Sequence, residues 1–252
     1  MSLIELRDVT KSFGDNKVLK GVNLEIEEGE SLIILGRSGI GKSVTLLIIT
    51  GLMPPDSGAV FIDGQDITKL SEIEMIALRR RFSYVFQSGA LFDSLSVYEN
   101  VAFPFAEDRH ISDEAAEKKV FSILQLLGLE KIADLMPDEI SSGMKKRVAI
   151  ARAIAADPRA ILYDEPTTGV DTITGKLISR LIRKLNKDLG VTTVVVTHDL
   201  KCAQFVADKV AFLHDGRIYF HDTFDAFLKS ELKELLRFKR SLPHMMKYIG
   251  AE

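Results

Sequence analysis

The chain has 252 residues, of which 46% are hydrophobic and 27% are charged, so it has the composition of a globular protein that buries a full core and is not mainly disordered. Its 33 Lys and Arg residues stand against 36 Asp and Glu residues, and the net charge of −3 argues against a nucleic-acid binder that works through a large positive field. The single cysteine, Cys202, excludes a disulfide framework and a multi-cysteine metal site, and no apolar run is long enough to span a membrane.

Short strand patterns alternate with helical patterns in the first third of the chain. Residues 22–27 alternate apolar and polar side chains, which predicts a half-buried antiparallel strand. The continuous apolar run 31–35 enters a glycine-rich turn, so it predicts a buried central strand, and residues 42–50 predict the helix that follows. Ser71, with Glu74 three residues later, predicts a capping box at the start of a helix. Further strands are predicted at 59–62 and 82–86.

The rest of the chain carries a helical insertion and then returning strands. Residues 89–156 have mostly helical patterning, with Ser112 as a predicted cap and Gly128 as a predicted stop. Asp215 and Gly216 lie between two apolar runs and predict a hairpin turn. Further strands are predicted at 160–164 and 192–197, and a helical tail from 231 onward with Leu232, Leu235, Leu236 and Lys239 on one face. A strand lobe interrupted by a helical insertion, in an α/β fold, is the simplest interpretation.

One glycine-rich segment between a predicted strand and a predicted helix has the pattern of a phosphate-binding loop. The segment consists of Gly36, Arg37, Ser38, Gly39, Ile40, Gly41, Lys42 and Ser43, and Val44 follows it on the helix. Its glycines let backbone N–H groups face inward, and the helix N-terminus adds about half a positive charge. Lys42 can reach the β- and γ-phosphates of a nucleotide, and the Ser43 hydroxyl can ligate Mg²⁺. The alternative is a glycine-rich turn with a solvated lysine, which the strand-to-helix context disfavours.

Three predicted strands end in polar side chains that suit the chemistry of a bound nucleotide. Asp164 can hold Mg²⁺, and Glu165 can polarise the attacking water. Gln87 can ligate Mg²⁺ or orient water, and a neutral His198 can bond the γ-phosphate and orient Glu165. Each alone has an ordinary explanation: a solvated turn, a loop amide or a structural histidine. Their shared position at strand ends, where open α/β sheets bind ligands, favours catalysis.

A second candidate anion site precedes an Ala-rich helical run. It consists of Ser141, Ser142, Gly143 and Met144. Ser and Gly ahead of a helix leave backbone N–H groups available to an anion. An ordinary helix cap explains the same residues, and on local grounds that explanation is the better one.

The chain resembles the ATP-binding subunit of ABC transporters in the order and spacing of six features. They are the segments 36–43, 140–144, 161–165 and 169–171, the last being Gly169, Val170 and Asp171, and the single residues Gln87 and His198. The resemblance covers about residues 3–230 and implies an ABC nucleotide-binding domain at 1–230, with a RecA-like P-loop NTPase core, an antiparallel β layer and a helical subdomain inserted at about 89–156. It implies a head-to-tail homodimer that encloses two ATP molecules, each shared by the phosphate loop of one copy and residues 141–144 of the other. Glu165 would then direct water at the γ-phosphate with help from His198, Gln87 and Asp171.

Three positions depart from the pattern of that family. Phe13 falls where the family usually stacks a Tyr on adenine, so stacking survives but the hydroxyl is lost. Ser142 replaces the usual first Gly of the signature, which would cost about 1 kcal/mol and slow turnover if the position needs a positive φ or a very close approach to the nucleotide. Met144 replaces the more common Gln and changes little.

Residues 88–104 resemble more narrowly the ATPase of Mla-type phospholipid transport systems, which work with MCE-domain proteins. This implies two copies of the chain beneath two integral membrane permeases, in the cytoplasm at the inner membrane face, with accessory and MCE-domain subunits as candidate partners and no nucleic acid. A permease helix would lie against an apolar groove wall formed by Ala90, Leu91, Phe92, Leu95, Val97 and Val101. The alternative for these residues is the core of the helical lobe.

Other functions stay open on the sequence. They are an importer of polar solutes such as amino acids, a soluble non-transport ABC protein of DNA repair or translation, and a nucleotide sensor without turnover, which only Ser142 suggests. The tail 231–252 would either grip a neighbouring subunit through Leu242, Met245, Met246, Tyr248 and Ile249 or pack internally. The basic runs 79–81 and 145–147 are interpreted as solvated helix faces, and Cys202 as an inert core residue.

Overall fold

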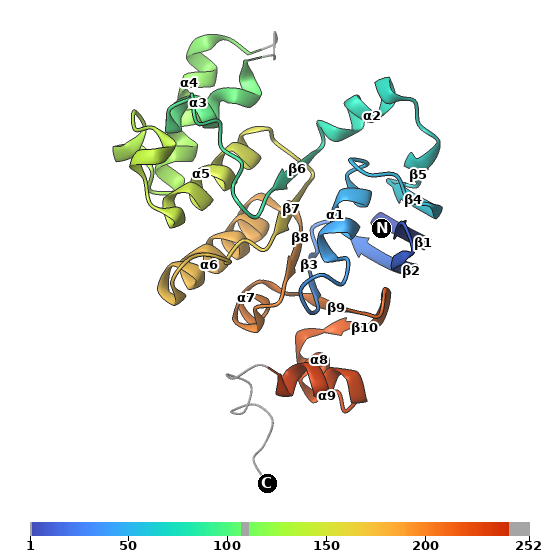
Figure 1. Ribbon diagram of the computed structural model, residues 1–252. Helices are drawn as coiled ribbons and strands as arrows, with labels where there is room; N and C mark the ends of the chain where they lie inside the picture. The colour runs from blue at the N-terminus through green and yellow to red at the C-terminus, as the bar shows by residue number, and fades with distance from the viewer. Residues whose placement is uncertain (1, 107–110, 242–252) are drawn as a thin grey trace. The chain divides into compact units, whose positions relative to one another are not determined.

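The structure is a computed structural model that describes residues 2–106 and 111–241 (Figure 1). The chain divides into two compact units: the first comprises the residues up to Leu70 and those from Val196 onward, and the second runs from Ser71 to Val195. Among the helices of the described residues, none is both long and apolar enough to cross a membrane.

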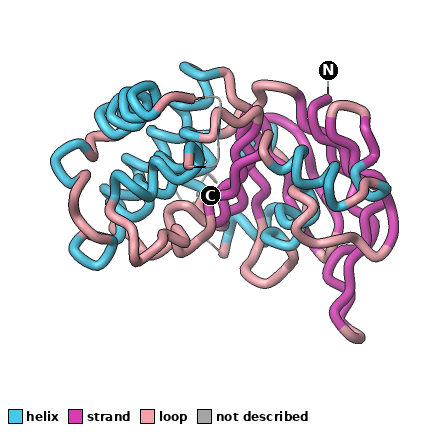
Figure 2. Tube along the Cα trace, turned by 90° about the horizontal axis from the view of Figure 1, so that it is seen from above, coloured by secondary structure: helices cyan, strands magenta, loops and turns pink. Residues whose placement is uncertain are grey.

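The first unit contains an antiparallel sheet in which β1 (Ser2–Phe13) lies between β2 (Asn16–Glu27) and β4 (Ser57–Ile62), and the short β5 (Gln65–Asp66) forms the far edge. The paired strands run as adjacent magenta tubes beside the N-terminus in Figure 2. On β2 the apolar residues at 22, 24 and 26 are buried and alternate with exposed polar ones, as predicted. One face of the sheet is therefore core and the other is polar.

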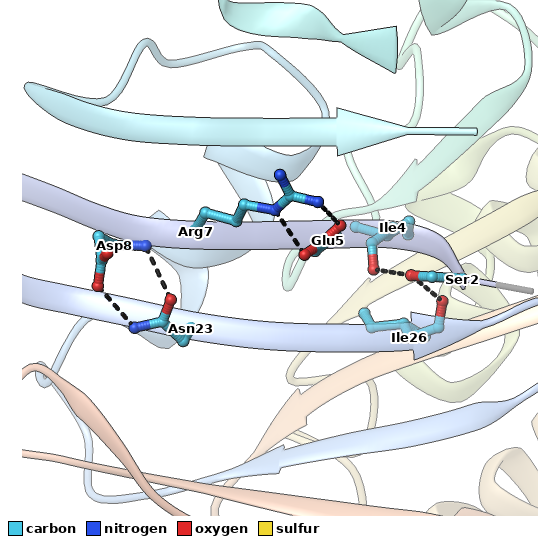
Figure 3. A network of polar contacts seen from close by, with 7 residues as sticks. All are labelled: Ser2, Ile4, Glu5, Arg7, Asp8, Asn23 and Ile26. Carbon is cyan, nitrogen blue, oxygen red and sulfur yellow. Dashed lines mark hydrogen bonds and ion pairs between the residues drawn. The ribbon is translucent and has the colours of Figure 1, made fainter. Parts of the chain in front are cut away.

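A bulge in β1 is held by a side chain of β2. Asp8 has a positive φ of 48°, which a non-glycine residue seldom adopts, and the pairing register shifts between Leu6 and Val9. Asn23 accepts a hydrogen bond from the Asp8 backbone N–H at 3.0 Å and donates to its carboxylate at 2.8 Å (Figure 3). The first bond gives the Asp8 backbone N–H an acceptor within the bulge, and the second joins the two side chains.

The first unit also holds the strand that leads into the glycine-rich loop. All residues of β3 (Ser31–Leu35) are buried, as its continuous apolar run predicts, and β3 pairs in parallel with β9 (Lys209–His214). β9 turns back into β10 (Arg217–Thr223) through Asp215 and Gly216, both at positive φ, so the predicted hairpin is confirmed. The helical elements of this unit are α1 (Lys42–Ile49), η1 (Ile67–Lys69), α7 (Leu200–Val206), α8 (Phe224–Lys229) and α9 (Lys233–Arg240). Cys202 is buried on α7, as expected for a core residue.

The second unit begins with α2 (Glu72–Arg79), where Ser71 and Glu74 form the predicted capping box. β6 (Phe82–Val85) pairs in parallel with β7 (Ala160–Asp164), and β8 (Thr192–Thr197) lies on the other side of β7, where the chain returns to the first unit. Both β7 and β8 are buried along their whole length, which is typical of central parallel strands.

The predicted helical insertion is also present in the second unit. α3 (Val97–Ala102), α4 (Asp113–Leu126) and α5 (Ser142–Ala155) pack on one another (Figure 1), with short η2 (Phe103–Phe105), η3 (Glu130–Ile132) and η4 (Pro137–Glu139) between them. Ser112 caps α4, and Gly128 follows it at a φ of 62°, as predicted. The long α6 (Thr172–Leu189) was not predicted, although the Asp171 cap and Gly190 stop signal it.

The predicted face of the tail helix is only partly right. On α9 Leu235 and Lys239 are buried, whereas Leu232, which precedes the helix, is 44% exposed. Phe238, which was not predicted on this face, is buried instead of Leu232 and packs on Phe212 of β9 with 5.0 Å between the ring centroids. The apolar residues predicted to grip a neighbouring subunit, from Leu242 to Ile249, lie outside the described residues.

Lys239 joins the tail helix to α8 through its ammonium group. The side chain is 1% exposed, and Nζ donates to the carbonyl oxygens of Phe227 at 3.3 Å, Leu228 at 3.0 Å and Ser230 at 2.7 Å. These carbonyls end α8, where no helical N–H reaches them. Burial lowers the pKa of Lys239, but the three bonds keep an ammonium acceptable there.

We expect Lys239→Met to lower the free energy of unfolding by about 1–3 kcal/mol, because Met fills the volume but leaves the three carbonyls without their donor. Chemical denaturation of the full chain measures the change. Arg240→Met, the exposed neighbour on the same helix, is the matched control and should change stability by less than about 0.5 kcal/mol. Equal stabilities of the two variants would contradict the capping role.

Candidate functional site

The predicted phosphate loop lies in the first unit, between the end of β3 and the start of α1. Gly41 precedes the helix at a φ of 108°, a conformation open to glycine. A Cβ on Gly36 would come within 2.7 Å of the Leu213 carbonyl oxygen, so the loop passes too close to β9 for any side chain there. The loop residues from Arg37 to Gly39 are exposed, whereas Lys42 is buried. The backbone thus forms an open turn whose N–H groups lead into a helix N-terminus.

Lys42 folds back over this loop. Its side chain is 5% exposed, and Nζ donates to the carbonyl oxygens of Gly36 and Arg37, both at 3.0 Å. The ammonium is therefore held against the loop by the loop's own backbone. Ser43 and Val44 follow on the first helical turn and are half-buried. The arrangement places a positive charge beside the loop, as the predicted phosphate site requires.

Two more predicted residues lie in the first unit. Phe13 ends β1 with its ring 48% exposed, and Lys11 lies 5.9 Å from the ring centroid. Lys11 itself forms an ion pair with Asp56 at 2.9 Å. Phe13 therefore has a ring surface available for stacking on a base.

His198 is exposed directly after β8, in a turn that Asp199 closes by accepting from the Lys201 N–H at 2.8 Å.

In the second unit, Asp164 ends β7 beside a tyrosine of the next strand. Asp164 is 8% exposed, and its Oδ2 accepts a hydrogen bond from the Tyr84 hydroxyl at 3.0 Å. Burial, and then the Asp164 charge, raise the pKa of Tyr84, so its hydroxyl stays a donor at neutral pH. Tyr84 therefore orients the Asp164 carboxylate. It was not among the predicted residues; its place on the strand 82–86, beside the one that ends in Asp164, is the only signal.

Glu165 has an unusual backbone conformation. Its φ is 45°, in the left-handed region, which costs a non-glycine residue about 1–3 kcal/mol. Two bonds from Thr168 hold the turn: its N–H donates to the Glu165 carbonyl at 3.1 Å, and its hydroxyl donates to Glu165 Oε2 at 3.3 Å. With 8% of its surface exposed, the carboxylate is a largely buried acid at a strand end.

The basic run 145–147 does not form a solvated helix face, because Lys146 is buried at 5% exposure. Its Nζ donates to the backbone carbonyl of Gln87 and, at 3.4 Å, to that of Glu165. The Gln87 side chain itself is on an exposed residue. Arg147 also turns inward and donates to the Leu127 carbonyl at 3.1 Å. The prediction failed because a run of basic residues says nothing about which of them faces the core.

The second candidate anion site has the geometry of a helix cap. Ser141 precedes α5, and its hydroxyl accepts from the Met144 N–H at 3.3 Å. Ser142 is the first residue of the helix and has no positive φ, so the part of the predicted penalty that depends on a positive φ does not arise. Gly143 packs closely on α6, because a Cβ there would come within 2.5 Å of Thr174 Cγ2 and the Thr174 side chain would have to shift.

Asp171 caps α6 with both carboxylate oxygens. Oδ1 accepts from the Ile173 N–H at 2.9 Å and the Thr174 N–H at 3.1 Å, and Oδ2 accepts from the Thr174 hydroxyl at 2.5 Å. The Thr174 hydroxyl bond is the main reason that the pKa of Asp171 is lowered, so the group is charged at neutral pH. Thr174 therefore contacts both residues: its hydroxyl bonds the exposed Asp171, and its methyl group lies against Gly143 of the predicted signature.

The proposed groove wall separates into buried and exposed residues. Val97 and Val101 are fully buried and belong to the core, as the alternative explanation holds. Phe92 is 41% exposed, and its ring packs at an angle of 37° against that of Phe103, which is 46% exposed, with 4.5 Å between the ring centroids. Arg152 of α5 lies 5.4 Å above the Phe92 ring and donates to the carbonyl oxygen of Ala90 at 2.8 Å. Of the proposed groove wall, the exposed aromatic residue is therefore Phe92, which packs on Phe103 and lies under the Arg152 guanidinium.

The donors predicted for Mg²⁺ suit a hard cation. Within residues 2–106 and 111–241, no group of three or more His, Cys, Asp or Glu side chains could hold a metal ion. The predicted donors are one hydroxyl (Ser43), one amide (Gln87) and one carboxylate (Asp164), all oxygen ligands. So few protein ligands are typical of Mg²⁺ that is bound together with phosphate groups and water.

Both the sequence and the fold have counterparts among known proteins. A family model described as "ABC transporter" matches residues 19–168. The intermembrane phospholipid transport system ATP-binding protein MlaF of Haemophilus influenzae is 39% identical over 237 residues, 94% of this chain and 90% of that protein. The methionine import ATP-binding protein MetN of Clostridium tetani is 39% identical over 249 residues, 96% of this chain and 77% of that protein. A solved dimeric, post-hydrolysis structure of the ATP-binding cassette MJ0796 with ADP and Pi matches at a TM-score of 0.79 and 39% identity, over 87% of this chain and 98% of that one.

Proposed function

The chain belongs to the ABC transporter family as an ATP-binding, ATP-hydrolysing subunit, and we propose that it powers the movement of a phospholipid through a membrane permease. Its fold is the predicted RecA-like P-loop NTPase fold. The segment 88–104 carries the lipid assignment, because its sequence resembles that of Mla-type ATPases. The exposed pair Phe92 and Phe103 in this segment offers a permease helix an apolar contact.

The residues of the phosphate loop and of the strand ends would act together on ATP. Gly36 to Ser43 would cradle the phosphates, with Lys42 neutralising the β- and γ-groups, and Phe13 would stack on the base. Glu165 would accept a proton from water as the water attacks the γ-phosphorus, and the bond to the β–γ bridging oxygen would break to give ADP and phosphate. His198, Gln87 and Asp171 would orient these groups. Mg²⁺, held by Ser43, Gln87 and Asp164, would neutralise charge on the phosphate oxygens.

Two copies of the chain would close on two ATP molecules. Ser141 and Ser142 are exposed at the N-terminus of α5, the position that a second copy's nucleotide requires. In this assembly each γ-phosphate would contact the loop 36–43 of one copy and residues 141–144 of the other. Hydrolysis would remove this bridge between the copies, so the dimer would open. Residues 1–230 would form the nucleotide-binding domain, and the tail 231–252 would add contacts between copies.

The dimer would work with permease subunits at the cytoplasmic face of the inner membrane, and accessory or MCE-domain subunits would complete the system. Reconstitution of the chain with its permease in phospholipid vesicles tests the substrate. We expect ATP-dependent transfer of a labelled phospholipid and no ATP-dependent uptake of labelled methionine. The same complex with Glu165→Gln is the control for a passive leak.

The second candidate function is amino-acid import, which the methionine-import relative favours. Methionine accumulation in the same vesicles without phospholipid transfer would reject the lipid assignment and support this one. ATP hydrolysis is common to both candidates, so only the transported molecule separates them.

A further inference from the structure

Lys146 is a buried cation in the helix that follows the signature residues. It lies in the second turn of α5, where Val148, Ala149 and Ile150 beside it are also buried. Lysine is almost never this buried unless its ammonium has partners, because the transfer of an unpaired charge from water is costly. Its position therefore calls for an explanation beyond packing.

The partners of Lys146 come from the ends of two neighbouring strands. β6 and β7 are parallel and pair Val85 with Tyr163. Gln87 and Glu165 each lie two residues beyond that pair, and Nζ of Lys146 donates to both of their backbone carbonyls, at 3.4 Å for Glu165. One ammonium thus joins the two segments that carry the proposed water-orienting amide and the proposed base to a single helix.

The surroundings of Lys146 show why a cation suits this place. Burial lowers its pKa, while the neighbouring Asp164 and Glu165 carboxylates act in the opposite direction. Glu165 also has a left-handed backbone, which other contacts must hold in place. The bond from Lys146 adds to the one that the Thr168 N–H donates to the same carbonyl.

We propose that Lys146 is a positioning residue for ATP hydrolysis, because it fixes the backbone from which the Gln87 amide and the Glu165 carboxylate extend. The proposal rests on the proposed role of Glu165 as the base. It predicts a loss of rate without a matching loss of ATP binding, since the phosphate loop lies elsewhere in the chain. Lys146 touches no reacting atom in this account.

The test compares Lys146→Met, which keeps the length but removes the charge and donors, with Lys146→Arg, which keeps both. In the full chain, kcat of Lys146→Met should fall at least about tenfold, because misplacement by about 1 Å can cost about 10²-fold. Its dissociation constant for ATP should stay within about twofold of the wild type, and Lys146→Arg should recover a large part of kcat. Lys145→Met, half-buried on the same helix, is the matched control and should leave both constants unchanged.

A wild-type kcat for Lys146→Met would overturn the proposal, and so would parallel losses of kcat and ATP affinity in both variants, which indicate general damage to the fold. If Lys146→Met is not recovered folded, Lys146→Gln replaces it, because its amide has no charge and its nitrogen ends one atom short of the lysine Nζ. Its kcat should fall in the same way, and Lys146→Arg should again recover a large part of it. Glu165→Gln is measured alongside. Full activity of that variant would refute the proposed base, whereas loss of its activity with normal Lys146→Met turnover would refute only the role of Lys146.

Discussion

Glu165→Gln should bind ATP normally and hydrolyse it about 10²–10⁴-fold more slowly than the wild type, the usual cost of losing a general base. The amide has the size of the carboxylate and can still accept the bond that the Thr168 hydroxyl donates to Oε2. Its proton affinity is far too low to take a proton from water. The substitution therefore removes the chemistry and leaves the turn in place.

Single-turnover release of phosphate and titration with ATP separate the two effects. The matched control is Glu130→Gln, an exposed acid in the same unit, which should turn over at the wild-type rate. If Glu165→Gln also turns over at that rate, Glu165 is not the base. If ATP binding falls with the rate, the substitution has disturbed the strand end, and the rate alone says nothing about the base.

Lys42→Ala is expected to weaken ATP binding by about 10- to 150-fold, because a hydrogen bond to a charged group contributes about 1.5–3 kcal/mol. The ammonium lies at 3.0 Å from the carbonyl oxygens of Gly36 and Arg37, so it is already placed on the loop before any nucleotide binds. Little ordering is then needed on binding, and most of its interaction with the phosphates appears as affinity.

Calorimetric titration with ATP and Mg²⁺ measures this loss. Lys17→Ala, an exposed lysine on β2 of the same unit, controls for the loss of one positive charge and should bind within about twofold of the wild type. Unchanged affinity in Lys42→Ala would count against the phosphate cradle. Thermal unfolding of Lys42→Ala without nucleotide measures how much stability is lost when the Gly36 and Arg37 carbonyls lose the bonds from Lys42.

The features that the sequence predicted well depend on local chemistry. The capping box of Ser71 and Glu74 and the hairpin at Asp215 and Gly216 are formed by residues within a few positions of each other. The strand 31–35 and the loop after it are also specified locally, by a continuous apolar run and by glycines that allow a tight turn. Such signals depend on backbone sterics and on hydrogen bonds over one turn.

The exposure of individual side chains was less predictable. Val97 and Phe92 carry the same apolar signal, yet Val97 is core and Phe92 is 41% exposed. Lys145 and Lys146 are adjacent and chemically identical, yet Lys146 is buried and Lys145 is only half-buried. Which face of α5 is covered depends on the helices and loops that pack against it, and those lie far away in the sequence.

By itself the sequence determined most of the strands and helices, though not β1 or α6, together with the glycine-rich turn 36–43 and the acids at the end of the strand 160–164, because each of these features depends on contiguous residues. Only the tertiary structure decided that Tyr84 orients Asp164, that Lys146 joins Gln87 to Glu165, and that Lys239 caps α8. Each of these polar side chains forms hydrogen bonds because the burial of a polar group without a hydrogen-bond partner is costly. The partners are backbone or carboxylate oxygens brought near by folding, which no local pattern encodes.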